Sequence, residues 1–513
     1  MPKHDFMPRV AASRAAALVM GAAMLAGCTL APHYERPVSP VAAAYPTGAA
    51  YRTNGTNAAS DAKDAVDLDW HDFFRDPRLQ RLIELSLQNN RDLRVAMLNV
   101  QASRAQYRIE RANLFPTLSA TASQTRERTP LDLLANNSAP STLSTLDQAG
   151  ASASWELDFF GRLQSLKDAA RYQYLASAQA QRAAQILLVS EVANQYLALG
   201  AADEQLRITA ETLAASQASY DLARTQFKAG ISSELDLRQA ETVVDQAQAD
   251  REAQTRVRAQ AENALVLLIG APLPADLPPG LPFDSPNLLA DVAAGIPSDL
   301  LARRPDIIEA EDTLRAANAN IGAARAAFFP SIALTANGGS ASTSLAGLFK
   351  AGSAAWTFVP SLTMPLFTAG SNLANLDLAH VQKNIAVAQY EKSIQAAFRE
   401  VADGLAARGT YSAQLDAQQR YTFAYRRTLD LSTARYRAGT DSYLQVLTAQ
   451  NGLYAAQQNL IVTQLNRLTS LVNLYGDLGG GWRADATAAA DAAGEQGVAG
   501  GKMTEGGKAA SAG

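Results

Sequence analysis

The chain has 513 residues and a formal net charge of −4, from 45 Lys and Arg against 49 Asp and Glu. It therefore has no basic excess to favour nucleic acid as a partner. Hydrophobic residues make up 48% of the chain and aromatic residues 7%, and Ala is abundant throughout. An Ala-rich sequence favours long helices, because Ala loses no side-chain entropy when a helix forms.

Residues 1–27 have the pattern of a secretory signal peptide. A positively charged stretch precedes an apolar run at residues 15–26, which is too short to span a bilayer as a mature helix. The small residues before Cys28 resemble the bacterial lipoprotein box, in which the Cys is acylated and becomes the new N-terminus. An ordinary cleavage site is the alternative, but Cys28 is the only Cys in the chain. We expect an N-acyl and S-diacylglycerol lipid on Cys28 and no other cofactor, and Thr29 is compatible with export to the outer membrane.

The chain contains an internal repeat. Residues 111–118 match residues 325–332, and residues 227–230 match residues 436–439. Two glycine pairs keep the same separation of 69 positions, one pair in each half: Gly161 and Gly230, and Gly370 and Gly439. The equal spacing indicates that a rigid length is kept in both halves.

Each half is predicted to hold shorter helices that end at Phe-Pro, then a β-hairpin, then a long helical hairpin. The first half follows an extended, lipidated linker at 28–76, and its three parts are 77–115, 116–160 and 161–270. A Pro-rich connector at 271–297 leads to the second half. The corresponding parts there are 298–328, 329–367 and 370–476, and a tail at 477–513 has no periodicity and is expected to be disordered.

Each predicted hairpin consists of two segments in which apolar residues alternate with small polar residues, as in a strand between two different environments. The apolar positions are Leu118, Ala120 and Ala122; Ala151, Ala153, Trp155, Leu157 and Phe159; Ile332, Leu334 and Ala336; and Trp356, Phe358, Leu362 and Met364. One interpretation is a soluble sandwich. The other is a transmembrane β-barrel, whose strands need roughly 9–11 residues to cross.

The barrel interpretation requires several copies of the chain. Two hairpins leave two bare edges, which lipid does not tolerate, and four strands cannot close a barrel. Two copies would give eight strands with a lumen filled by side chains, and three copies would give twelve with an open bore.

The long helical hairpins are each predicted to turn at a glycine. Gly230 and Gly439 suit the position after a helix, and the Ser, Thr or Asp residues that follow suit the start of the next one. A helix of 69 residues would be about 100 Å long. The last return helix also has a coiled-coil seam: Leu447, Asn451, Tyr454, Gln458, Ile461, Leu465, Leu468, Val472 and Tyr475.

The chain resembles the TolC-like outer membrane factors, specifically the NodT or OprM-like efflux lipoproteins. The matching stretches are residues 296–307, 310–311, 316–319, 321–322 and 328–332, with residues 28–37 near the N-terminus. The resemblance covers residues 28–476. It implies a mixed α and β fold, with a long antiparallel coiled-coil α-barrel, a small equatorial helical domain and a trimeric, 12-stranded transmembrane β-barrel. It also implies a homotrimer in outer-membrane lipid, a periplasmic adaptor and an inner-membrane pump, usually of the RND class. Such a component is a passive, gated duct.

The resemblance places a periplasmic gate at the hairpin turns. Asp236 and Tyr436 match a polar tie between the two hairpins, as carboxylate acceptor and phenol donor. Leu444 would project as an apolar constriction. Relatives often carry an acidic residue where this chain has Thr448, sometimes another at Gln445, and an Arg at one of two other positions, here Asp441 and Asn451. This departure predicts weak cation selectivity. Each polar tip residue could also be a solvated helix-end residue.

Other functions have less support. The four His residues are scattered singly (His4, His33, His71 and His380), no Cys can join them, and Gly501-Lys502 lacks the rest of a P-loop. We therefore expect neither an enzyme nor a metal site. A type I protein-secretion duct of the same fold and a non-pore coiled-coil adhesin are the alternatives to an efflux duct.

Overall fold

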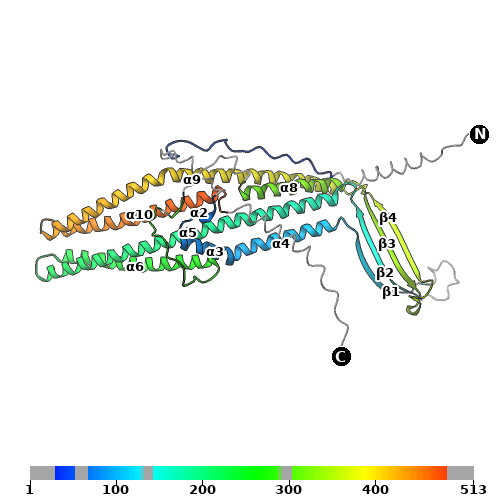
Figure 1. The fold of residues 1–513 in the computed structure, drawn as a ribbon, viewed down its shortest axis with the longest axis horizontal. Coiled ribbons are helices and arrows are strands. Elements are labelled where there is room, and N and C mark those ends of the chain that lie inside the picture. The colour runs from blue at the N-terminus through cyan, green and yellow to red at the C-terminus, as the bar shows by residue number, and fades with distance from the viewer. Residues whose placement is uncertain are drawn as a thin grey trace, which may run out of the picture. The chain divides into compact units, whose positions relative to one another are not determined.

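The computed structural model describes residues 29–51, 68–128, 130, 143–286, 288–290 and 303–481. The signal peptide, Cys28 and almost all of the predicted tail lie outside these residues. The chain forms two compact units, to which both halves of the sequence contribute (Figure 1). Unit 1 holds the N-terminal residues up to Val38, Leu98–Ala178 and Glu309–Glu391. Unit 2 holds Ser39–Met97, Gln179–Ile308 and the residues from Lys392 onward.

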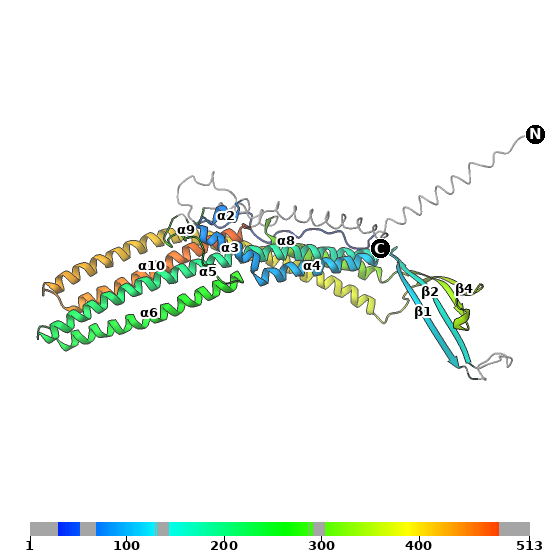
Figure 2. The ribbon, with the colours of Figure 1, turned by 60° about the horizontal axis from the view of Figure 1, so that its bottom comes forward.

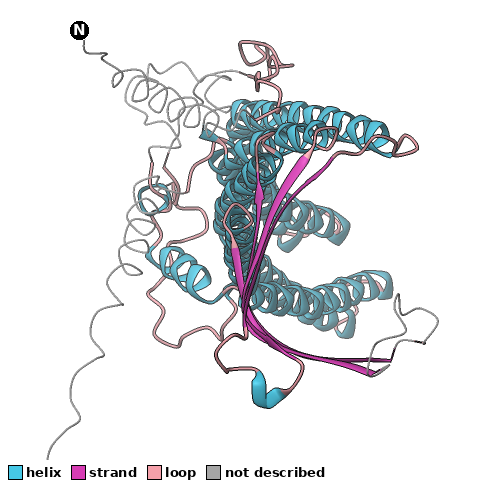
Figure 3. Ribbon diagram, turned by 90° about the vertical axis from the view of Figure 1, so that its right-hand side faces the viewer, coloured by secondary structure: helices cyan, strands magenta, loops and turns pink. Residues whose placement is uncertain are grey.

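Unit 1 contains one antiparallel sheet of four strands in the order β1-β2-β3-β4, which is strongly curved (Figure 3). The strands are β1 (Thr117–Arg128), β2 (Leu143–Leu157), β3 (Ser331–Ser342) and β4 (Ala354–Thr363), with a short 3₁₀ helix, η4 (Leu345–Gly347), between the last two. The two predicted hairpins are therefore joined by pairing of β2 with β3. Phe159 and Met364 follow their strands rather than ending them.

The strand register places the apolar positions of all four strands on one face of the sheet. Directly opposed residues share a face, and the register aligns one apolar row and, beside it, one polar row: Leu118, Ala153, Ala336 and Phe358, and Ser119, Ser152, Asn337 and Thr357. On the polar face, Asn337 Nδ2 donates to Thr357 Oγ1 at 3.1 Å. The two faces of the sheet are thus chemically different, as the alternation predicts.

The two longest helices have the same length. They are α5 (Arg162–Lys228) and α9 (Ser371–Arg437), each of 67 residues. Each turns at a glycine into a return helix, α6 (Glu234–Ile269) or α10 (Tyr443–Asp477). In unit 2 each pair runs side by side as an antiparallel hairpin (Figure 2). The equal glycine spacing in the sequence therefore corresponds to equal helices, which confirms that prediction.

Four shorter helices complete the described structure: α2 (Trp70–Phe73), α3 (Pro77–Asn89), α4 (Arg91–Ala112) and α8 (Pro305–Ala326). The buried carboxylate of Asp76 begins α3 by accepting from Arg78 N at 2.8 Å. Its second oxygen accepts from the Tyr196 hydroxyl at 2.8 Å and from Leu281 N at 2.9 Å. One side chain thus joins α3, α5 and the Pro-rich connector inside unit 2.

The buried face of α10 differs from the predicted seam at the end near the turn. Ile461, Leu468, Val472 and Tyr475 are buried as expected. Nearer the turn the buried residues are Tyr443, Val446, Ala449 and Gln450, whereas Asn451 is exposed. The seam prediction is wrong at Asn451, whereas Leu447 is half-buried and packs against buried residues of three helices. Near the turn α10 packs against several helices and therefore buries a wider face than a two-helix seam. Within the described residues, none of the helices combines the length and apolar character that a membrane crossing requires.

Candidate functional site

The candidate site is the pair of turns that end the long helical hairpins of unit 2. Gly230 and Gly439 have φ angles of 72° and 76°, in the left-handed region that favours glycine. Ile231 N donates to Gln226 O and Thr440 N donates to Arg435 O, at 2.9 and 3.0 Å. These bonds, with those from each glycine N–H to the residue three positions back, make a Schellman motif at both turns. The two hairpins therefore end in the same backbone geometry.

The side chains that start the return helices differ between the two turns. Ser233 caps α6 in a reciprocal capping box, in which Asp236 N donates to Ser233 Oγ and the Asp236 carboxylate accepts from Ser233 N. Ser442 caps α10 without a side-chain hydrogen bond. Instead Asp441 forms an ion pair with Arg435, in which Arg435 Nε lies 2.5 Å from Asp441 Oδ2. This bond lowers the pKa of the Asp441 carboxyl.

An apolar cluster lies close to both turns and joins all four long helices. Its buried members are Ala223 of α5, Ala240 of α6, and Tyr443 and Val446 of α10, and four half-buried residues pack against them: Tyr220, Leu429, Tyr436 and Leu447. We call these eight residues the tip cluster. The rings of Tyr436 and Tyr443 lie 5.5 Å apart. The hairpins are thus held together by burial of apolar surface.

In the structure the Tyr436 hydroxyl has a hydrogen-bond partner other than the predicted Asp236. The Tyr436 hydroxyl donates to Gln226 Oε1 of the first hairpin at 2.6 Å. Asp236 is occupied by its own helix cap, with Ser233 Oγ donating to it at 2.8 Å. Burial, and then the nearby charge of Asp236, raise the pKa of the Tyr436 hydroxyl. A polar tie between hairpins therefore exists, but Gln226 is its acceptor.

The remaining predicted gate residues lie together on α10. Leu444 is 50% exposed, and Gln445, Thr448 and Asn451 are exposed. Leu444, Thr448 and Asn451 are spaced by four and three residues, so they follow one face of the helix. Thr448 Oγ1 donates to Leu444 O within α10 at 2.8 Å. We call these four residues the exposed stripe. It has no charged side chain.

Sequence reasoning missed two contacts near this site. Gln226 and Arg435 occupy equivalent positions, four residues before Gly230 and Gly439, and their carbonyls accept the longer bond of each Schellman motif. A single sequence gives no sign that their side chains have different partners. Gly452 of α10 packs on Tyr425 of α9, and a Cβ at Gly452 would lie only 2.1 Å from the Tyr425 ring. A glycine inside a predicted helix is the signal that could have indicated this close approach.

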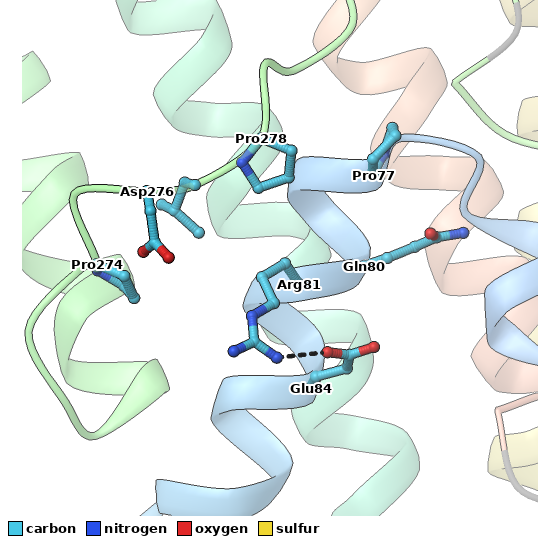
Figure 4. Close-up of a pocket in the computed structure, with 8 residues that line it drawn as sticks. Pro77, Gln80, Arg81, Glu84, Pro274, Asp276 and Pro278 are labelled. Atoms are coloured by element: carbon cyan, nitrogen blue, oxygen red, sulfur yellow. Dashed lines mark hydrogen bonds and ion pairs between the residues drawn. The ribbon is translucent and has the colours of Figure 1, made fainter.

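The described ranges offer no candidate metal site. They contain no group of three or more His, Cys, Asp or Glu residues able to hold a metal ion. A hollow of about 260 Å³ in unit 2 lies between α3 and the connector, lined by prolines and by Arg81 and Glu84 (Figure 4). Arg81 and Glu84 form an ion pair of 2.8 Å, with side chains 49% and 39% exposed. Such a solvated pair contributes little to stability.

Comparison with known proteins identifies the family. The model of the outer membrane efflux protein family matches residues 82–271 and 296–480. A probable efflux pump outer membrane protein of Pseudomonas putida, TtgC, is 50% identical over 465 residues, which cover 91% of this chain and 95% of the relative.

Two solved structures are similar in both fold and sequence. A membrane protein from Pseudomonas aeruginosa has a TM-score of 0.81 and 44% identity, covering 88% of this chain and 100% of that one. The open state of the Neisseria gonorrhoeae MtrE outer membrane channel has a TM-score of 0.78 and 40% identity, covering 88% and 98%. The chain belongs to the outer membrane efflux protein family.

Proposed function

We propose that the chain is the outer-membrane duct of a tripartite efflux system, a passive and gated channel that exports small molecules. The observation that carries the proposal is the exposed apolar face of the sheet. Leu118, Trp356 and Leu362 on that face are 78%, 79% and 65% exposed. A soluble sandwich would cover such a face, whereas lipid solvates it. The opposite face carries Ser, Thr and Asn and suits a wet lumen.

Closing the sheet into a barrel requires further copies of the chain. Within the described residues β1 and β4 each pair on one side only. In lipid their free N–H and C=O groups would cost several kcal/mol each. Pairing β1 of one copy with β4 of the next satisfies both edges. Three copies give twelve strands and an open bore, whereas two give eight and a filled one, so a duct favours the homotrimer.

Exposed apolar residues on the helices next to these edges support the same association. Leu98 and Ile109 of α4, which precedes β1, are 51% and 56% exposed. Leu378, Val381 and Ile385 of α9, which follows β4, are 52–53% exposed and share one helix face. Joining β1 of one copy to β4 of the next would bring α4 and α9 together and bury these exposed apolar side chains on both helices.

The gate lies at the hairpin turns in this proposal. Around a threefold axis the exposed stripe would give a ring of Leu444 side chains, which can gate by dewetting. Gln445 and Thr448 would form uncharged polar rings, which bind cations only weakly. Tyr436 and Gln226 would hold the second hairpin to the first in one state of the gate.

The partners follow from the family and the named relative. An efflux pump outer membrane protein works with an inner-membrane pump, which we propose to be of the RND class, through a periplasmic adaptor. Energy is supplied at the pump. Acylation of Cys28 would add an anchor in the outer membrane, at about 0.8 kcal/mol for each buried CH₂ group.

The test is conductance together with export. Mature, lipidated protein in planar bilayers should form discrete channels, and deletion of the gene should raise accumulation of exported compounds. The matched control is the same protein with Gly439→Pro, which breaks the second turn. Absence of channels from well-folded, membrane-inserted protein would refute the duct.

A further inference from the structure

The first described residues of unit 1 run as an extended segment along α8 (dark blue in Figure 1). Arg325 Nη1 donates to Leu30 O at 3.1 Å, and Asn318 Nδ2 donates to Pro32 O at 2.8 Å. Gly322 faces the segment, because a Cβ there would lie 2.9 Å from Ala31 Cα. These contacts are made to backbone, so they fix the path of the segment whatever its side chains.

The far end of the segment is held by a buried carboxylate. The Glu311 side chain is 3% exposed. It accepts from Arg36 Nε at 3.0 Å and Nη2 at 2.6 Å, and from the Tyr34 hydroxyl at 3.0 Å. Arg315 of α8 donates from Nη2 to the same carboxylate at 2.7 Å. Its guanidinium carbon also lies over the Tyr34 ring, 5.2 Å from the ring centroid. The Arg36 side chain is 49% exposed, so the pair is half-buried, but its bidentate geometry on a buried carboxylate makes it specific.

The near end of the segment lies where the strands join the helices. Thr29 Oγ1 lies 3.0 Å from Oγ of Ser165, which is in the first turn of α5 and 1% exposed. The extended segment from Leu30 to Arg36 spans about 20 Å, and α8 from Arg325 to Glu311 spans about 21 Å. The two therefore run antiparallel in matched register, and a slip of one residue would break the Arg36 pair and the Thr29 contact together.

We propose that residues 29–36 form a strap that is locked onto α8 by Glu311, and that this lock fixes the place where the lipid-bearing N-terminus meets the first turn of α5. Glu311 is a positioning residue in this proposal. Without the strap it would be a buried carboxylate facing Arg315 alone. The consequence for the anchor rests on the lipid at Cys28 proposed above, whereas the lock itself does not.

The test measures opening of the strap at one end after its lock is broken at the other. Ser165→Cys provides a thiol beneath Thr29. The mature lipidated protein is treated with a maleimide, and labelling of this thiol is followed by peptide mapping. The labelling rate reports the fraction of time that the strap is open. Glu311→Gln keeps the shape of the side chain but removes its charge. Because it weakens charge-assisted bonds to Arg36, it should speed labelling by at least about tenfold.

Two controls separate release of the strap from general loosening. Ala316→Cys is buried on a different face of α8, about 140° from the strap-facing residues, and its labelling should not change with Glu311→Gln. Arg81→Ala breaks an exposed ion pair in unit 2 and should leave the labelling of Ser165→Cys unchanged.

The lock predicts a specific pattern in combination. Arg36→Ala should also speed labelling, though by no more than Glu311→Gln, which weakens the bonds from Tyr34 and Arg315 as well. The two together should add little to Glu311→Gln alone, because both remove the Arg36 pair. Unchanged labelling of Ser165→Cys, or equal acceleration at Ala316→Cys, would overturn the proposal. Labelling does not depend on channel formation, so absence of conductance would refute the duct without affecting this result.

Discussion

Removal of one hydroxyl tests whether the hairpin tie belongs to the gate. Tyr436→Phe deletes the donor to Gln226 Oε1, a bond of 2.6 Å between the two hairpins, and keeps the ring in the tip cluster. A hydrogen bond between neutral, half-buried groups contributes about 1 kcal/mol net. That energy corresponds to about a fivefold change in an equilibrium constant. If the tie stabilises the closed state, its loss should raise the equilibrium constant for opening by about fivefold for each subunit. Single channels should therefore be open for a larger fraction of the time.

Tyr443→Phe is the matched control. Its ring lies 5.5 Å from that of Tyr436 in the same cluster, and its hydroxyl makes no hydrogen bond within the described structure. Single-channel recording should therefore show little change with Tyr443→Phe. Gln226→Ala should act like Tyr436→Phe, and the double variant should add little to either. Equal effects of the two Tyr variants would refute the assignment of the tie to the gate.

Three further predictions concern stability and the membrane. Gly452→Ala places a Cβ about 2.1 Å from the Tyr425 ring, and the resulting overpacking should cost about 1–3 kcal/mol in chemical denaturation; an unchanged midpoint would contradict the packing. Burial, then the charge of Glu400, raises the pKa of Asp477 to about 6. The folded state therefore favours the protonated acid, and the ionised carboxylate destabilises it at pH 7. Asp477→Asn should stabilise the protein at pH 7 by at most about 3 kcal/mol and lose this benefit below pH 4. Thermal unfolding at both pH values measures this, and equal gains at both would contradict the pKa shift. Trp356→Arg on the apolar face should cost about 2–4 kcal/mol or prevent assembly in membranes, whereas Thr357→Arg on the other face should be tolerated; the reverse order would invert the assignment of the faces.

Local chemistry made much of the fold predictable. The positions of Gly230 and Gly439 predicted where the long hairpins turn, because a left-handed residue after a helix favours glycine. The alternation of apolar and polar residues predicted the two faces of the sheet, because side chains alternate along any strand. The pairing of β2 with β3 was not predicted, since period-two patterns do not specify which strands are neighbours.

Contacts between distant residues explain what the sequence did not reveal. The Ser233-x-x-Asp236 spacing is a capping box that could have been read locally, and it would have shown that Asp236 was already engaged. Gln226 and Tyr436 are 210 positions apart, and Arg36 and Glu311 are 275 apart. No spacing rule links such pairs. The predicted seam failed near the turn for a similar reason, because the face that α10 buries there depends on three other helices.

In the proposed duct, several copies of the chain share one closed sheet. The most direct measurement is native mass spectrometry of the lipidated protein released from detergent. The account predicts a complex of three chains, which dissociates when a charged residue such as Arg replaces an apolar residue next to the β1 or β4 edge. A stable, folded monomer that keeps β1 and β4 unpaired would contradict it.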